Sequence, residues 1–220
     1  YYSWVLYDWA NSAYATIVLA GFFPIIYAEY FAASVDSSER TLYLGISNSV
    51  ASLLLIISAP FFGLLADRFN KKKLFLSIFA IISIASTFFL SFVSSNSYIL
   101  ASIFFSISLL GFMMSNVFYD AMLLDFESDK FNKISSYGYA FGYLGGGIAF
   151  VLALIFIYYA GKSNIELIAS KKIVFIFTSI WWAFFMVPLI LYWEDNSQPN
   201  SIKLSISDSF KELFNNKKIF

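Results

Sequence analysis

Residues 63–73 read GLLADRFNKKK, and five of the last seven side chains carry a charge. The 26 residues before them, 41–66, contain no charged side chain, and neither do the 46 residues that follow, 74–119. Each uncharged window is too long to be one helix of a soluble core. The pattern predicts that residues 67–73, called the basic loop below, form a short aqueous connection between two membrane-spanning helices.

The composition supports a membrane protein and excludes several other classes. Hydrophobic residues make up 60% of the chain and charged residues 13%, against roughly a quarter in average soluble proteins. The formal net charge is zero, which argues against a nucleic-acid partner. Because the 220 residues contain no Cys and no His, they offer no disulfide, thiol nucleophile, histidine-based triad or zinc site. We expect no catalytic residues, no metal and no cofactor.

Uncharged windows define the spanning segments. Residues 9–28, 134–161 and 173–193 are uncharged in addition to the two windows above. The window 74–119 is about twice the ~20 residues of one crossing, and 94–97, Ser-Ser-Asn-Ser, is its turn. The sequence predicts an all-α membrane domain over 1–193 with six helices, at about 4–31, 42–66, 74–93, 98–119, 135–160 and 173–193.

The last segment, 194–220, differs from the rest. Its first residues form a polar linker, and Phe210, Leu213 and Phe214 then follow helical spacing. We interpret it as an amphipathic helix on the membrane surface, with a disordered tail as the alternative. Since the sequence starts at Tyr1 rather than Met and stops soon after this helix begins, we expect a fragment of a longer protein.

The distribution of Lys and Arg predicts the orientation. With six spans, ten basic residues lie on the side of the basic loop and of both chain ends, and four lie on the other side. An excess of Lys and Arg marks the cytoplasmic side, so we predict that both termini are cytoplasmic.

The first predicted helix carries polar residues along one face. Asp8, Asn11, Ser12 and Ala15 share that face, and Tyr14 continues a second line through Asn11. An acid and an amide on a spanning helix are costly unless they face protein or water, which predicts a stripe that faces a solute or a proton. For Asp8, an anchor at the membrane interface is the alternative. With polar residues of helices 2 and 4, these make our candidates for lining a central cavity: Asp8, Asn11, Tyr14, Asn48, Asn116 and Tyr119.

The fifth predicted helix contains a glycine-rich face. Gly138, Gly142 and Gly146 recur every four residues, which leaves a ridge without side chains that another helix approaches closely. Gly147 completes the set of predicted packing glycines. Acids near the end of helix 4 (Asp120, Asp125, Glu127 and Asp129) face the same side as the basic loop. We expect either cross-loop ion pairs that change with conformation or weak surface pairs.

These features together resemble the N-terminal half of a major facilitator superfamily transporter. In that superfamily the loop between helices 2 and 3 has Gly, three residues, Asp, Arg or Lys, one residue, Gly and two basic residues. Its counterparts here are Gly63, Asp67, Arg68, Asn70, Lys71 and Lys72. Asn70 replaces a glycine, but Asn is the residue that best tolerates the left-handed conformation after glycine. Helix 5 is similar to the antiporter motif, with Tyr143 in place of its proline.

Four stretches resemble a narrower branch, the fungal vacuolar amino-acid effluxers and their uncharacterised bacterial relatives. They are YDWANSAY at 7–14, GFFP at 21–24, GISNS at 45–49 and YGYAFGYLGGG at 137–147. The resemblance implies a twelve-helix fold of which this chain is half, a C-terminal six-helix partner half, and a solute site between the halves. It also implies secondary transport of a small solute by alternating access, in the bilayer of a bacterial inner membrane. Amino-acid export comes from the resemblance to this branch alone, and protons are the candidate coupling ion.

Two other classes compete with a transporter. A membrane-embedded enzyme would have only Asp, Glu, Ser or Lys available, and the predicted spans contain no acid pair of the intramembrane-protease kind. A non-transporting six-helix subunit that forms a homodimer or binds another membrane chain is the stronger alternative.

Overall fold

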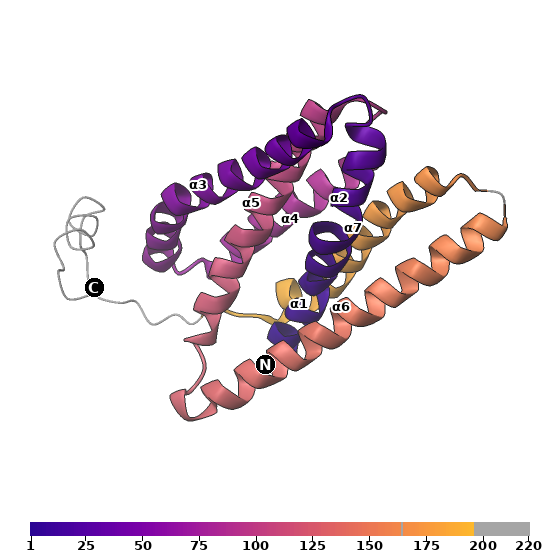
Figure 1. The fold of residues 1–220 in the computed structure, drawn as a ribbon. Helices are drawn as coiled ribbons and strands as arrows, with labels where there is room; N and C mark the ends of the chain where they lie inside the picture. Colours follow the sequence, from indigo (N-terminus) through magenta and orange to yellow (C-terminus); the bar gives the residue numbers. More distant parts are fainter. Residues whose placement is uncertain (164, 196–220) are drawn as a thin grey trace.

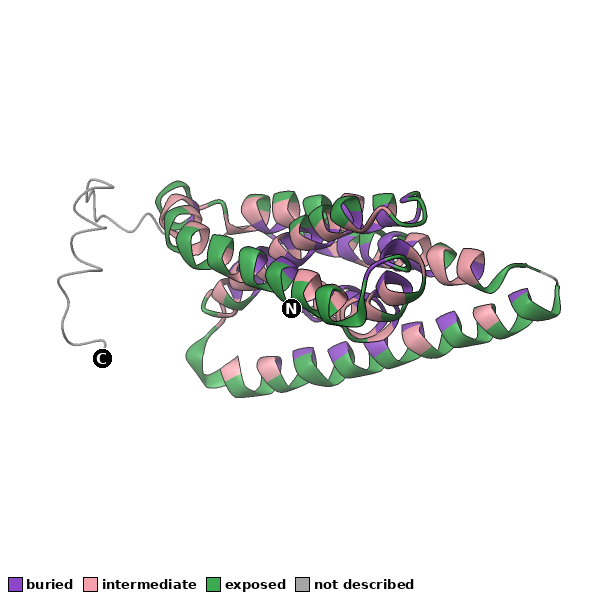
Figure 2. Ribbon diagram, turned by 45° about the horizontal axis from the view of Figure 1, so that its top comes forward, coloured by how far each residue is buried: buried purple, intermediate pink, exposed green. Residues whose placement is uncertain are grey.

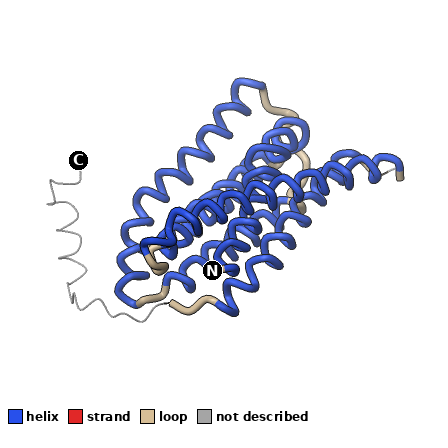
Figure 3. The backbone as a smooth tube through the Cα atoms, turned by 90° about the horizontal axis from the view of Figure 1, so that it is seen from below, coloured by secondary structure: helices blue, strands red, loops and turns tan. Residues whose placement is uncertain are grey.

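The computed structural model describes residues 1–163 and 165–195, and these residues form helices joined by short loops, without strands (Figure 3). It contains six helices that are long and apolar enough to cross a membrane, which confirms the predicted fold class. The first span, Tyr2–Phe31, consists of four consecutive segments: α1 (Tyr2–Ala13), η1 (Tyr14–Phe22), α2 (Phe23–Ile26) and η2 (Tyr27–Phe31). The other five spans contain α3 (Ser37–Phe69), α4 (Lys72–Leu90), α5 (Tyr98–Leu123), α6 (Phe131–Lys162) and α7 (Leu167–Tyr192). A short 3₁₀ helix, η3 (Ser128–Lys130), precedes α6. The surface helix predicted around Phe210 lies outside the described residues.

The first span changes its winding around Pro24. Proline has no backbone N–H and cannot donate to the turn before it. The flanking segments η1 and η2 are π-helical, and at their ends Phe23 and Ala32 donate backbone hydrogen bonds to the carbonyls five residues earlier. The helix therefore accommodates Pro24 through wider helical turns on both sides, a feature that is frequent at functional sites.

Most of the basic loop belongs to α3 and α4, and only Asn70 and Lys71 form the turn between these helices. Asn70 adopts the left-handed conformation with φ 50° and ψ 56°, and its backbone N–H donates to the Ala66 and Asp67 carbonyls. The tolerance expected of Asn at this glycine position is confirmed. The chain thus reverses direction as soon as α3 ends.

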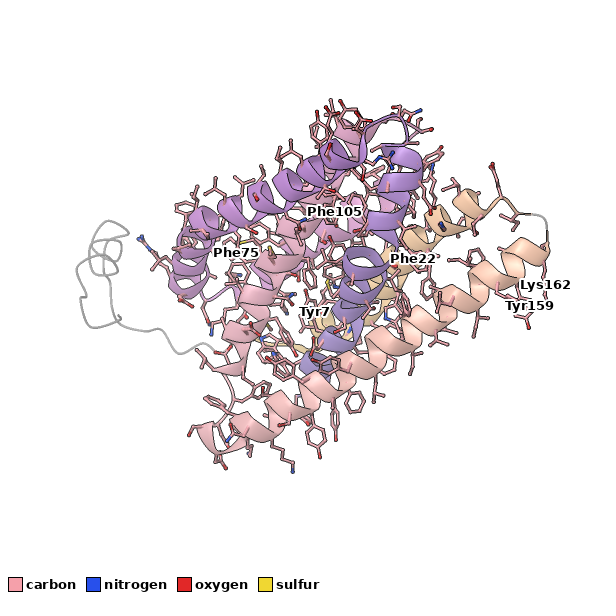
Figure 4. The ribbon with its side chains drawn as sticks, in the orientation of Figure 1. Tyr7, Phe22, Phe75, Phe105, Tyr159 and Lys162 are labelled. Carbon is pink, nitrogen blue, oxygen red and sulfur yellow. The ribbon has the colours of Figure 1, made fainter. Side chains whose placement is uncertain are left out.

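The helices form a bundle with α3 and α6 at its two edges (Figure 1). The closest pairing is that of α4 with α5, while α1 packs against both α6 and α7. The large buried side chains include Tyr7, Phe23, Phe105 and Trp182, and Tyr7 and Phe105 lie in the interior in Figure 4. Small residues allow the α4–α5 contact: a Cβ added at Gly111 would lie 2.7 Å from the Phe79 carbonyl oxygen.

The two edge helices expose long apolar faces. Figure 2 shows α6 with buried positions along its inner side and exposed positions along its outer side. Its exposed apolar residues include Leu144, Val151 and Ile155, and those of α3 include Leu53 and Ile57. Such faces suit contact with lipid or with further membrane helices rather than with water.

Candidate functional site

A cavity of about 470 Å³ opens where α1, α5 and α6 meet. Its lining combines polar, acidic and aromatic side chains, and we call it the polar cavity. The lining residues are Trp4, Asp8, Asn11, Ser12, Ala15, Phe112, Asn116, Tyr119, Asp120, Leu123, Ser135 and Tyr139. Ligand pockets for small molecules are typically of this size.

The polar face of α1 forms one wall of this cavity. The four residues predicted to share a helix face, Asp8, Asn11, Ser12 and Ala15, all line it. They line the same cavity because residues three and four positions apart lie on the same side of a helix. The structure thus places Asp8 beside the interior space, partly buried, rather than at an exposed helix end.

A hydrogen bond between amides joins this wall to α5. The Asn11 Nδ2 donates to the Asn116 Oδ1 at 2.6 Å, and Asn11 is 2% exposed. A buried amide needs such a partner because an unsatisfied polar group in a low-dielectric interior is costly. The bond leaves the Asn116 amide nitrogen available to a ligand.

Two stacked aromatic rings form the end of the cavity near the chain start. The rings of Trp4 and Tyr119 are 4.2 Å apart and nearly parallel, at 10°. The Trp4 indole Nε1 donates to the Tyr119 backbone oxygen at 3.0 Å, which fixes the stack. The Tyr119 hydroxyl, in contrast, is buried and has no hydrogen-bond partner among the described residues.

Glycines of α6 bring that helix onto the cavity wall. A Cβ at Gly138 would lie 2.7 Å from the Trp4 ring, and one at Gly142 would lie 2.6 Å from Asp8 Oδ2. At Gly146 it would lie 3.0 Å from the Ser12 carbonyl oxygen. The glycine ridge predicted from the four-residue spacing therefore packs α6 closely against α1, at the residues of α1 that line the cavity.

The other two glycines of this run differ from each other. Gly145 lies against α1 as well, since a Cβ there would be 2.5 Å from the Trp9 carbonyl oxygen. Gly147 faces away from α1, and a Cβ there would meet no atom within 4 Å. The reason is geometric, because each residue turns the helix by about 100°.

Two predicted cavity residues lie elsewhere. Tyr14 is fully buried between the rings of Phe112 (4.9 Å) and Trp182 (5.7 Å), below the cavity lining. Asn48 is exposed on α3, where its Nδ2 donates to the Leu44 carbonyl of its own helix. The structure does not bring Asn48 to the polar cavity.

The residues of the loop motif lie at one end of the bundle. Asp67 and Arg68 are exposed in the last turn of α3, and a Cβ at Gly63 would meet no atom within 4 Å. Lys71 precedes α4 as its N-cap residue. Lys72 instead reaches α5, where its Nζ lies 2.7 Å from Asp125 Oδ1 and donates to the Ala121 carbonyl oxygen.

This contact with α5 matches the expected cross-loop ion pair. Both partners of the Lys72–Asp125 pair are mostly buried, with side-chain exposures of 14% and 16%. Glu127 pairs instead with Lys130 on the surface, at 56–71% exposure, and that pair is of the weak kind. Lys73 fastens α4 to the end of α7, where its Nζ donates to the Trp193 carbonyl at 2.6 Å.

Several lining residues were not among the sequence candidates. Asp120 follows Asn116 by four positions on α5, so helical spacing alone could have identified it. Trp4, Ser135 and Tyr139 carry no comparable signal, because their place depends on how α1 and α6 pack. Among the described residues no group of three acidic, His or Cys side chains could hold a metal ion.

Six helices long and apolar enough to cross a membrane define an integral, multi-pass membrane protein. The chain belongs to the vacuole effluxer Atg22-like family, whose sequence model matches residues 37–219. It is 35% identical over 215 residues to an uncharacterised MFS-type transporter, YxiO, of Bacillus subtilis strain 168. The aligned region covers 96% of this chain and 50% of that protein. A second relative, an uncharacterised protein of Aquifex aeolicus strain VF5, is 30% identical over 149 residues, 68% of this chain and 36% of that protein.

The chain thus spans about half the length of the first of these relatives and about a third of the second. The match to half of an MFS-type transporter confirms the resemblance drawn from the basic loop and the glycine-rich helix. No solved structure matches the chain significantly.

Proposed function

We propose that this chain forms one half of the solute pathway of a secondary active transporter that works by alternating access. The polar cavity carries the proposal, because polar and acidic side chains on three spanning helices are costly in a bilayer and mark solute or ion pathways. The family description and the MFS-type relative support the same activity. The finer proposal, export of amino acids, rests on the resemblance to the effluxer branch.

Alternating access requires that one end of the pathway closes while the other opens. At the end of the bundle that carries the basic loop, Lys72 pairs with Asp125 just after α5, and Lys73 donates to Trp193 at the end of α7. At the opposite end, Lys171 of α7 and Glu29 of η2 pair at 2.5 Å. We propose that Asp67 and Arg68, which are exposed beside the first of these clusters, form a latch with the other half of the transporter and release it as the halves rock.

The orientation and location are part of this proposal. In the topology predicted from the sequence, ten of the fourteen Lys and Arg residues fall on the side of the basic loop, so we place that side in the cytoplasm. We place the protein in the plasma membrane of a bacterium, in line with its bacterial relatives. The binding partners are then the bilayer, the solute, protons as the candidate coupling ion, and a second six-helix half.

The test is flux through the full-length protein in proteoliposomes, with a panel of amino acids and amines. We expect Asp67→Asn to insert normally and to lose most of its transport. Asp36→Asn is the matched control, since Asp36 is exposed at the other end of α3 and makes no capping hydrogen bond with its side chain. Near-normal flux in Asp67→Asn would remove the latch. Absence of any solute flux in the parent protein would overturn the transporter and favour the non-transporting subunit.

A further inference from the structure

We propose that Asp8 and Asp120, together with Trp4 and Tyr119, form a subsite for the ammonium group of an organic solute. The inference rests on the proposed function, because it takes the polar cavity as the solute pathway. It goes beyond that function by naming the chemical group that this half of the transporter recognises and the residues that recognise it.

The charges of the cavity favour a cation. Its lining, as far as the described residues show, contains the carboxylates of Asp8 and Asp120 and no Lys or Arg. The only hydrogen bond to Asp8 within the described residues comes from Ser12 Oγ, at a long 3.5 Å. Asp120 receives none there. Asp8 is partly buried, where a carboxylate without a cationic partner is costly, and a bound cation would supply that partner.

Three other acids in the described part of the chain have basic partners. Asp125 pairs with Lys72, Glu127 with Lys130, and Glu29 with Lys171, all at 2.5–2.7 Å. Among the described residues, Asp8 and Asp120 have no ion pair, and neither do exposed acids outside the cavity lining such as Asp36, Asp67 and Asp129. Asp8 differs from those exposed acids because it is partly buried in the cavity lining, where a bound cation would compensate its charge.

Neutral groups around the carboxylates complete the site. The Tyr119 side chain is 5% exposed, and its hydroxyl, which has no partner in the described part of the chain, can accept a hydrogen bond from an N–H group. The Asn116 and Ser12 side chains add further polar contacts in the same lining. An ammonium group has three donors, which this number of acceptors can satisfy.

The size and the aromatic walls favour an organic cation over a metal ion or a proton. A space of about 470 Å³ is much larger than an inorganic ion needs. Trp4, Tyr119, Phe112 and Tyr139 line it, and aromatic faces attract alkylammonium groups and cover their carbon stems. The stack of Trp4 on Tyr119 fixes two of these rings before the solute binds.

The test compares three probes of similar shape and different charge: 2-phenylethylamine, 2-phenylethanol and 3-phenylpropionate. Their affinities for the purified full-length protein in nanodiscs are measured at equilibrium by calorimetry. We expect the amine to bind roughly tenfold or more tightly than the alcohol, the usual advantage of a hydrogen bond to a charged group. Asp8→Asn and Asp120→Asn should each reduce this preference several-fold and leave the affinity for the alcohol nearly unchanged.

Asp129→Asn is the matched control, because Asp129 is exposed and lies outside the cavity lining. Thermal unfolding verifies that each variant is folded, and Asp120→Asn, at an exposed position, keeps the test valid if Asp8→Asn does not fold. Any of four results would overturn the subsite. The amine and the alcohol could bind equally, the carboxylate could bind more tightly than the amine, none of the three could bind, or 100 mM sodium ion could displace the amine. Binding is measured without transport, so the two proposals can fail separately. If the parent protein shows no ammonium preference but normal flux, only the subsite is rejected. If it shows the preference but no flux, the transporter is rejected.

Discussion

Alanine substitutions in the glycine run of α6 test whether this helix positions the cavity wall. At Gly142 an added Cβ would lie 2.6 Å from Asp8 Oδ2, 2.8 Å from Asp8 Cγ and 3.0 Å from Ser12 Oγ. The first two atoms belong to the end of a side chain that can rotate away. To reach an ordinary contact of about 3.4 Å, the carboxylate must move by about 0.8 Å. Gly142→Ala should therefore fold normally but hold Asp8 in the wrong place.

The neighbouring glycines supply matched controls. At Gly145 the added Cβ would meet the Trp9 backbone, 2.5 Å from its oxygen, and a backbone cannot turn aside. We expect Gly145→Ala to lower the unfolding free energy by about 1–3 kcal/mol, the usual cost of overpacking. Gly147 has open space, so Gly147→Ala should be neutral or stabilising by up to about 1 kcal/mol through its better helix propensity.

Two assays separate these effects, namely thermal unfolding in nanodiscs and binding of 2-phenylethylamine. The account predicts that Gly142→Ala keeps the parent's melting temperature while its affinity falls roughly tenfold, because a sub-ångström displacement of a binding group is costly. Gly145→Ala should lose stability, and Gly147→Ala should change neither quantity for the worse. Parent-like affinity in Gly142→Ala, or equal damage from Gly147→Ala, would refute the argument.

Three further predictions concern contacts that hold the cavity and the basic loop. In a double-mutant cycle of Asn11→Ala and Asn116→Ala, the coupling energy from thermal unfolding should be about 0.6–1 kcal/mol, and additive effects would show that the amide bond contributes nothing. Lys72→Met should lower the unfolding free energy by about 1.5–3 kcal/mol because it removes the hydrogen-bonded ion pair with Asp125, and unchanged stability would show that the pair contributes nothing. Asn70→Gly should exceed Asn70→Val in stability by about 1–2 kcal/mol, since only the former suits φ 50°; equal stabilities would contradict this.

The number of spans was predictable because charge-free windows report directly on the bilayer. Even the turn inside the uncharged window 74–119 followed from the Ser94–Ser97 run, and α4 and α5 are separated by Ser91–Ser97. The left-handed residue between α3 and α4 followed from the chemistry of Asn70. These features depend on short stretches of sequence, each of which has few alternatives.

Features that depend on packing between distant helices were harder to predict from the sequence. The sequence left open whether Asp8 anchors the helix end or faces a cavity, and only the approach of α5 and α6 places it beside an interior space. Asn48 has a polar side chain on a spanning helix, as Asn11 does, yet α3 packs at the edge of the bundle and leaves Asn48 exposed. Periodicity defines the faces of a helix, but it does not tell which face meets a neighbour.

The π-helical turns on either side of Pro24 were also beyond the sequence. A proline predicts a lost hydrogen bond, but the local response depends on the surrounding helices. Trp4 and Tyr139 similarly gained a place in the cavity lining only through the packing of α1 against α6.

Accessibility of the polar cavity from the two sides of the membrane tests alternating access most directly. The chain contains no cysteine, so Ser12→Cys places a single thiol of this chain in the cavity, and Ala10→Cys, at a fully buried position of the same helix, is the control. In full-length protein without other cysteines, a membrane-impermeant thiol reagent is added to right-side-out or to inverted vesicles. The account predicts labelling of Ser12→Cys from both sides, slowed by a transported solute, with Ala10→Cys unlabelled. Labelling of Ser12→Cys from one side only, or from neither, would contradict it.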